Sequence, residues 1–181
     1  DFQPFKIPQH VVTLLRGLRT KRTLEFGSAP KWLSNLGLGA NTAVKDYVSN
    51  ATRMNTTDDI AVIRFRAPYS ADSSGPGQVR YWSFCFQNLA RNMTLNCLPD
   101  YIAKKDQGKV ITLVHGRRNS LVERTANEAG FYFIPDIRNE DPTDDAVQKV
   151  VAFIYRNLLP TASFDSVAYT SDYNPTGRVC T

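Results

Sequence analysis

The sequence predicts a mostly β protein, an antiparallel β-sandwich with one or two short helices. Three observations lead to this fold class: about six short segments rich in β-branched and aromatic residues, polar turn-like loops between them, and two cysteines at hairpin spacing. With 181 residues, of which 42% are hydrophobic and 22% charged, the chain is long enough to bury a core. We therefore expect a single domain over residues 1–181.

The central stretch of the chain is residues 79–97, VRYWSFCFQNLARNMTLNC. Residues 79–87 alternate like a strand, and one face carries Arg80, Trp82, Phe84 and Phe86. Residues 88–92 are typical of a turn, after which residues 93–98 return as a second strand. Such a hairpin places Cys85 opposite Cys97, at a spacing that suits a disulfide. The pattern predicts a disulfide-bonded hairpin with an aromatic inner face.

We expect residues 1–43 to form an N-terminal strap, a short helix and a loop. The strap is the proline-containing segment 1–10, and apolar residues at helical spacing predict an amphipathic helix over 9–22. Residues 27–43 have the composition of a loop. A strap of this kind is a candidate for pairing with the sheet edge of a neighbouring molecule.

We expect the sandwich core to cover residues 44–160, followed by a polar C-terminal tail over 161–181. Helices are predicted at 120–130 and after Thr143. The predicted strand at 131–134 is expected to end at Pro135. The further predicted strands are residues 46–52, 60–66, 109–115, 131–134, 150–158 and, in the tail, 166–169.

The net charge of +5 and the pI of about 9.2 indicate a mild basic excess, part of it clustered at residues 16–22. Two interpretations remain open. The cluster is either a patch for an acidic partner, such as a nucleic acid, an anionic polymer or an anionic membrane, or a solvated basic face. No motif of a nucleic-acid-binding module accompanies it. No apolar run approaches the length that a membrane-spanning helix needs.

Three asparagines lie in glycosylation sequons: Asn50, Asn55 and Asn92. Together with the predicted disulfide they favour a secreted, extracellular glycoprotein. Cys180 is left over, and we expect it to be free or to bond another chain or a ligand.

Several segments resemble a group of secreted, mostly bacterial proteins of unknown function, related to jelly-roll-like C-terminal domains of larger proteins. The resemblance spans roughly residues 44–160 and lies in the order of its segments, which are IAVIRFRAP at 60–68, RYWSFC at 80–85, Cys97 and Asp100, GKVITLV at 108–114 and IYRNLLP at 154–160. It implies a jelly-roll-like β-sandwich and no established activity. The segment FYFIP at 131–135 departs from the group's usual pattern.

The sequence offers no convergent catalytic set, so we expect no catalytic residue, no metal and no cofactor. Its two histidines, His10 and His115, have no cysteine or carboxylate at metal-ligand spacing. Ser83 lies outside any nucleophile-elbow motif, and no glycine-rich phosphate or dinucleotide loop occurs. Paired acids such as Asp58 and Asp59 are adjacent in loops, where solvation is the ordinary state.

Two arginines are candidates for ligand binding because they alternate with apolar residues. Arg80 shares a predicted face with Trp82, and Arg156 alternates with Ile154. A buried arginine needs a partner, because an unpaired buried charge is costly. Each is either a ligand-holding arginine in a cavity or, as we favour, a structural arginine near a strand end.

Three functional hypotheses follow. The first is an extracellular structural or self-assembling subunit, joined through its terminal segments or Cys180. The second is a module that binds a carbohydrate or another small ligand through aromatic residues and arginine. The third is an enzyme of unknown class. We place them in that order, with the first two close together.

Overall fold

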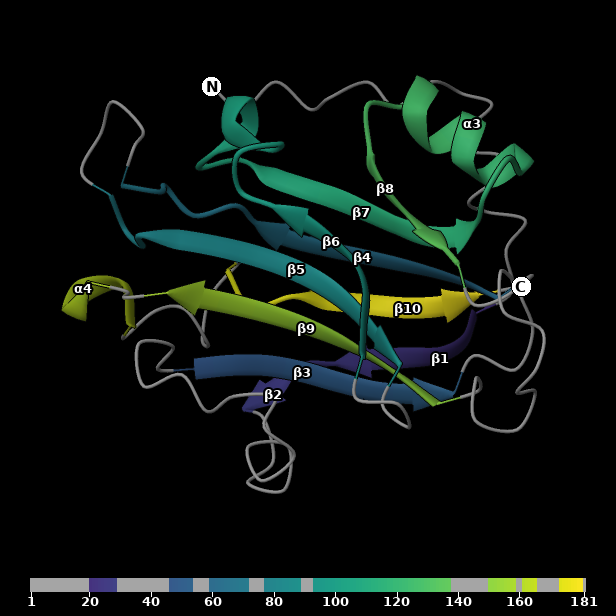
Figure 1. The fold of residues 1–181 in the computed structure, drawn as a ribbon, viewed down its shortest axis with the longest axis horizontal. Coiled ribbons are helices and arrows are strands. Elements are labelled where there is room, and N and C mark those ends of the chain that lie inside the picture. Colours follow the sequence, from purple (N-terminus) through teal and green to yellow (C-terminus); the bar gives the residue numbers. More distant parts are fainter. Residues whose placement is uncertain are drawn as a thin grey trace.

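A computed structural model describes residues 20–28, 46–53, 59–71, 77–88, 93–137, 150–158, 161–165 and 173–180. The fold is mostly β, with two sheets whose strands run along the long axis of the molecule (Figure 1). Sheet A has the order β1-β10-β4-β7-β8, and sheet B has the order β2-β3-β9-β5-β6. All strand pairs are antiparallel except β7 with β8, which is parallel.

The elements of sheet A are β1 (Thr20–Glu25), β4 (Ile60–Arg66), β7 (Val110–Arg117), β8 (Tyr132–Asp136) and β10 (Thr176–Cys180). Those of sheet B are β2 (Gly27–Ser28), β3 (Asp46–Arg53), β5 (Tyr81–Asn88), β6 (Met93–Pro99) and β9 (Val150–Leu158). The described helices are η1 (Lys104–Asp106), α3 (Leu121–Glu128) and α4 (Ala162–Asp165).

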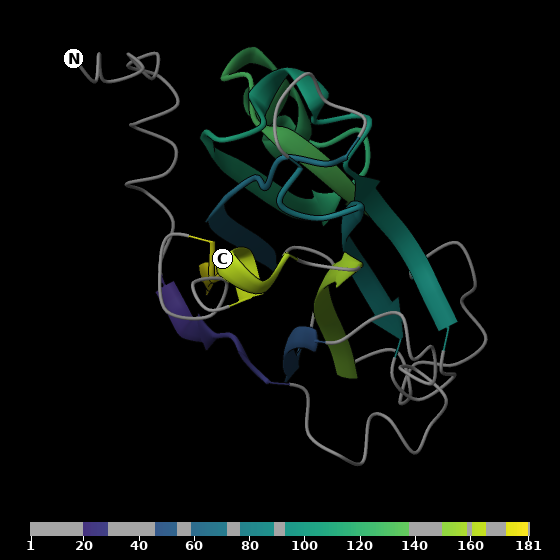
Figure 2. The ribbon, with the colours of Figure 1, turned by 90° about the vertical axis from the view of Figure 1, so that its left-hand side faces the viewer.

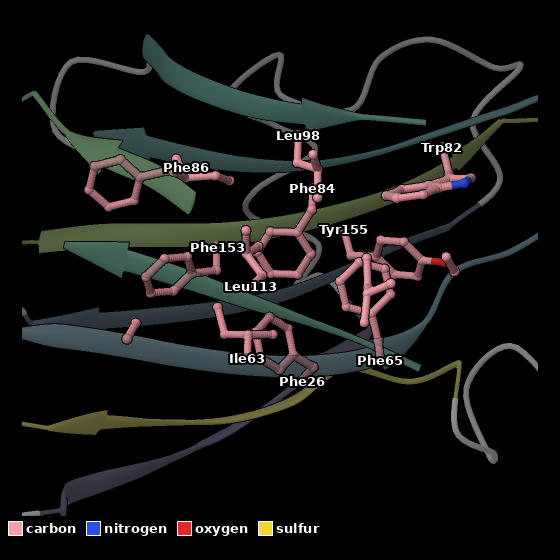
Figure 3. Close-up of a cluster of buried hydrophobic side chains, with 14 of the residues drawn as sticks. Phe26, Ile63, Phe65, Trp82, Phe84, Phe86, Leu98, Leu113, Phe153 and Tyr155 are labelled. Carbon is pink, nitrogen blue, oxygen red and sulfur yellow. The ribbon is translucent and has the colours of Figure 1, made fainter. Parts of the chain in front are cut away.

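The two sheets face each other across an aromatic core (Figure 3). Phe65 of β4 contacts both Trp82 and Phe84 of β5, with ring centroids 5.6 Å and 5.5 Å apart. The predicted inner face of β5 is confirmed, because Trp82, Phe84 and Phe86 have no exposed surface. β9 contributes Phe153 and Tyr155 to the same core. Burial of these large side chains is the main source of stability in such a fold.

The predicted hairpin and its disulfide are confirmed. Cys85 of β5 pairs with Cys97 of β6 in the strand register, and the two are bonded with their Cα atoms 4.1 Å apart. The bond lies on the face of β5 away from the aromatic core. Closing a loop of this length stabilises a chain by about 3 kcal/mol on the chain-entropy model.

The C-terminal segment differs from the predicted tail. Strand β10 lies in the middle of sheet A, between β1 and β4, and pairs with both along its length. Cys180 is fully buried, and Phe164 of α4 belongs to the core. Every second residue of this short strand faces the core, and its polar residues occupy the other face. A prediction based on the polar composition of residues 161–181 therefore misses a strand of this kind.

Two local predictions need correction. Pro135 does not end β8 but lies within it, opposite Gly116 of β7. A proline is tolerated there because β8 is an edge strand with one neighbour. The segment 20–25, placed partly in an N-terminal helix, is strand β1. The strap 1–10, the rest of the 9–22 helix, the helix after Thr143 and the strand 166–169 lie outside the described residues.

Helix α3 confirms the predicted helix at 120–130 and lies next to β7 and β8 at one end of sheet A (Figure 1). Its Val122 and Ala126 pack with Ile60, Val62 and Val114 of β4 and β7. The helix connects β7 to β8, which is why these strands are parallel: a helical crossover returns the chain to the same end of the sheet.

Candidate ligand-binding surface

One end of the molecule is formed by the loops that follow β4, β6 and β9, and Figure 2 looks onto this end. Trp82, at the start of β5, holds two of these loops. Its indole N–H donates to the carbonyl of Pro68 at 3.2 Å, and its own carbonyl accepts from the N–H of Asp100 at 3.0 Å. The residues after these two, Tyr69 and Tyr101, are thereby anchored near a single buried tryptophan.

Tyr69, Tyr101 and Ile102 form what we call the tyrosine surface. The exposed fractions of these side chains are 40%, 69% and 51%, so all three present apolar surface to solvent. Leu121, on α3, is the other large hydrophobic residue that is similarly exposed among those described.

The backbone under the tyrosine surface is fixed by Gly108. Its φ is +76°, a conformation that favours glycine, and a Cβ at this position would collide with the ring and hydroxyl of Tyr69. Gly108 also donates its N–H to the carbonyl of Ala67 at 2.7 Å and accepts from the guanidinium of Arg66 at 2.6 Å. The loop carrying Tyr101 is therefore tied to the loop carrying Tyr69.

Lysines surround the tyrosine surface. Lys104, Lys105 and Lys109 are exposed and lie, like Tyr101, in the loop 100–109 between β6 and β7. Lys109 forms an ion pair with Asp106, with 3.2 Å between Nζ and Oδ1. This surface therefore combines aromatic rings, on which a sugar can stack, with ammonium groups that favour anions.

Asp106 also holds the loop to strand β8. The Tyr132 hydroxyl donates to its Oδ2 at 2.6 Å. Burial, followed by this hydrogen bond and the charge of Asp106, raises the pKa of Tyr132 above its ordinary value of about 10. Tyr132 thus stays protonated and keeps donating at neutral pH.

The predicted arginines do not converge on one site. Arg80 precedes β5 and is exposed, as the strand-end interpretation requires, and its backbone N–H donates to the carbonyl of Leu158. Arg156 is half-buried in β9, opposite Ser83 in the register. Ser83 alternates with the core residues Trp82 and Phe84, so Arg156 lies on the face of sheet B away from the core.

The structure also reveals a buried pair that the sequence analysis missed. His115 of β7 and Asp136 of β8 are buried, with 3.6 Å between Nε2 and Oδ2. His115 Nδ1 lies 2.9 Å from the carbonyl oxygen of Ile134, so Nδ1 is the donor, and the Phe86 ring centroid lies 3.9 Å away. Neither side chain reaches the surface, and the pair joins β7 to β8 within the protein interior.

The glycosylation sequons differ in their settings. Asn50 lies within β3, opposite Phe153 of β9, rather than near the end of the strand. A residue in a paired strand is a poorer acceptor than one in a surface loop, so we expect lower occupancy at Asn50 than in a loop. Asn55 and Asn92 lie outside the described residues.

Among the described residues, no group of three or more metal-ligating side chains converges. No helix in this part of the chain is long and apolar enough to cross a membrane.

Comparisons with models of protein families, with curated proteins and with solved structures produce no match.

Proposed function

We propose that the protein is an extracellular binding module that recognises a carbohydrate through the tyrosine surface, on a jelly-roll-like β-sandwich. The observation that carries the proposal is the exposure of Tyr69 and Tyr101 on loops held rigidly by Trp82 and Gly108. A preorganised aromatic pair loses little freedom when a flat apolar sugar face stacks on it.

The strand order supports the jelly-roll component. If β2 and β8 are set aside, the sheets are β1-β10-β4-β7 and β3-β9-β5-β6. Two four-stranded sheets whose successive strands mostly alternate between them match the eight-stranded, double Greek-key arrangement. Jelly rolls serve both as lectins and as assembly subunits, so the fold itself does not select a function.

The extracellular setting is supported by the disulfide between Cys85 and Cys97. Structural disulfides persist mainly in oxidising compartments. Glycosylation and secretion remain predictions, which a mass shift on glycosidase treatment of the native protein would test.

Two of the features that favoured self-assembly were the leftover Cys180 and the C-terminal tail, and the structure disfavours both as bridges between molecules. Cys180 is buried, so it cannot crosslink chains, and residues 176–180 are occupied in sheet A. Among the four described edge strands, β8 contains Pro135, β2 has two residues, and the pairings of β1 and β6 are each interrupted by a register shift. The strap 1–10 remains a prediction, tested by the assembly state of a chain lacking these residues.

The experiment is a binding screen of the full chain against soluble glycans and polysaccharides, followed by Tyr101→Ala. We expect this variant to lose about tenfold in affinity, the equivalent of about 1.4 kcal/mol for one lost stacking contact. Leu121→Ala, which removes an equally exposed apolar side chain from α3, is the matched control and should bind normally. Equal affinity of the two variants, or no carbohydrate binding at all, would refute the proposal.

A further inference from the structure

The outer face of sheet A is divided into two halves. Towards the α3 end, the outward residues are Ile60, Val62 and Val114, all covered by the helix. Towards the tyrosine surface, the outward residues of β4 and β10 become polar, whereas β7 has Thr112 and then Val110. The part of the outer face that the helix does not cover, which we call the arginine face, carries Arg64, Arg66, Thr112 and Thr176, and it extends along β10 to Arg178, opposite Val62.

Two arginines on this face are close neighbours. Arg64 of β4 is opposite Thr176 of β10, and Arg178 of β10 is opposite Val62 of β4. Arg64 and Arg178 are thus diagonal neighbours on one face, at about 7–8 Å between their Cα atoms. Two like charges in this arrangement repel each other, a cost that a bound anion would remove.

The arginine face offers little internal compensation among the described side chains. The residues opposite Arg64 are Thr176 and Thr112, and Arg178 is opposite Thr23 on β1. No ion pair joins either arginine to a carboxylate in the described part of the chain. Glu25 is opposite Thr176 in the register, and its side chain is not among those that the structure describes.

The arginine face continues into the tyrosine surface through Arg66. Its guanidinium donates to the carbonyl of Gly108, and its Cζ lies 6.0 Å from the ring centre of Tyr173. Lys109 follows Gly108 in the chain, and Lys104 and Lys105 precede it in the same loop. A line of cations therefore runs from Arg178 across two strands to the loop that carries Tyr101.

We infer that the arginine face binds an acidic polysaccharide, one that carries sulfate or carboxylate groups along its chain. This inference rests on the proposed carbohydrate-binding function and extends it to the charge of the ligand. An extended polyanion suits a flat sheet with cations on neighbouring strands, because each guanidinium offers a planar pair of donors to an oxyanion. The adjacent tyrosines favour a sugar chain over a bare polyphosphate backbone.

The experiment compares dextran sulfate with uncharged dextran, which has the same backbone, and measures binding of the full chain at several salt concentrations. We expect dextran sulfate to bind at least tenfold more tightly, with an affinity that falls as salt rises. The double variant Arg64→Glu/Arg178→Glu should lose at least tenfold in affinity for dextran sulfate. The control is the double variant Arg117→Glu/Arg124→Glu, in which Arg124 lies on the exposed side of α3. This control changes the net charge by the same amount as the test variant.

Several outcomes would overturn the inference: equal affinity for both dextrans, equal losses in the double variant and its charge-matched control, or tighter binding of a single-stranded oligonucleotide at the same salt. If the charge-reversed variant does not fold, as judged by its thermal unfolding, Arg64→Gln/Arg178→Gln provides the same comparison.

Tyr101→Ala separates the two proposals. Unchanged dextran sulfate binding in this variant, with loss in the arginine variants, refutes the tyrosine site and leaves the arginine face standing.

Discussion

The two halves of the outer face of sheet A share the same strands yet have opposite surfaces. Along β4, the outward positions run Ile60, Val62, Arg64, and the change from apolar to charged occurs within two residues. The apolar half is buried under α3, whereas Arg64 is exposed. A single strand is therefore buried on both faces at one end and exposed on one face at the other.

The difference separates the part of the outer face that stabilises the fold from the part for which we propose a ligand. The covered half has apolar outward residues that require the helix, because leaving them in water costs about 25 cal/mol per Å². The arginine face has long polar side chains that require no cover, so it is available for a ligand. Substitutions in the first half should act on folding, and those in the second on binding.

The largest expected effect comes from a charge placed in the covered half. Val114→Asp buries a carboxylate among apolar side chains and should lower the free energy of unfolding by about 3 kcal/mol or more. Thr112→Asp, two residues earlier on the same face and opposite Arg64, should change it by less than about 0.5 kcal/mol. Urea unfolding of both variants with the disulfide intact measures the difference. Similar losses in the two would contradict the division of the face.

A smaller effect is expected at Tyr132, which holds the lysine-bearing loop to β8. Tyr132→Phe removes the hydrogen bond to Asp106 and should lower the free energy of unfolding by about 1.5 kcal/mol at neutral pH. Because the folded state raises the pKa of Tyr132, its contribution is complete below pH 10, where the unfolded tyrosine is also protonated. It is lost as the pH rises further, because the unfolded tyrosine releases its proton first.

The measurement is urea unfolding of the wild-type protein and Tyr132→Phe between pH 7 and 11. The gap between the two proteins should shrink above about pH 10. A gap that stays constant or widens over this range would show that Tyr132 ionises as easily in the folded state as in the unfolded one.

The smallest effect is expected at the start of α3. The Ser120 hydroxyl accepts from the N–H of Glu123 at 3.2 Å, and the Glu123 carboxylate accepts from the N–H of Asn119, as in a capping box. Ser120→Ala should cost about 1 kcal/mol and speed amide hydrogen exchange in α3. Ser120→Asp retains an N-cap acceptor and should restore most of the loss. If α3 exchanges equally fast in all three proteins, the cap does not stabilise it.

Local sequence pattern predicted much of the scaffold. The alternation around Trp82, Phe84 and Phe86 identified the inner face of β5, and the spacing of Cys85 and Cys97 gave the disulfide. These features depend on neighbours within one hairpin, so the period of two residues and the turn length suffice.

The candidate surface was less accessible to that reasoning. Tyr69 and Tyr101 occur in separate polar loops, and the residues before them, Pro68 and Asp100, both hydrogen-bond to Trp82, which lies in a strand between them in the chain. Arg80 and Arg156 drew attention through alternation, but the register places Arg156 away from the core and Arg80 at a strand end. An aromatic residue in an otherwise polar turn was the available signal for Tyr101.

The sequence by itself determined most of the short β-strands, although not β1 or β10, together with the disulfide-bonded hairpin, helix α3 and aromatic residues of the core. Each of these features depends on periodicity or spacing within about twenty residues. The tertiary structure decided that β10 lies in the middle of sheet A, that His115 meets Asp136, and that Arg178 lies beside Arg64. These outcomes join residues about twenty to more than a hundred positions apart. They follow from which strands pair across the whole chain, and local patterns of hydrophobicity do not encode that choice.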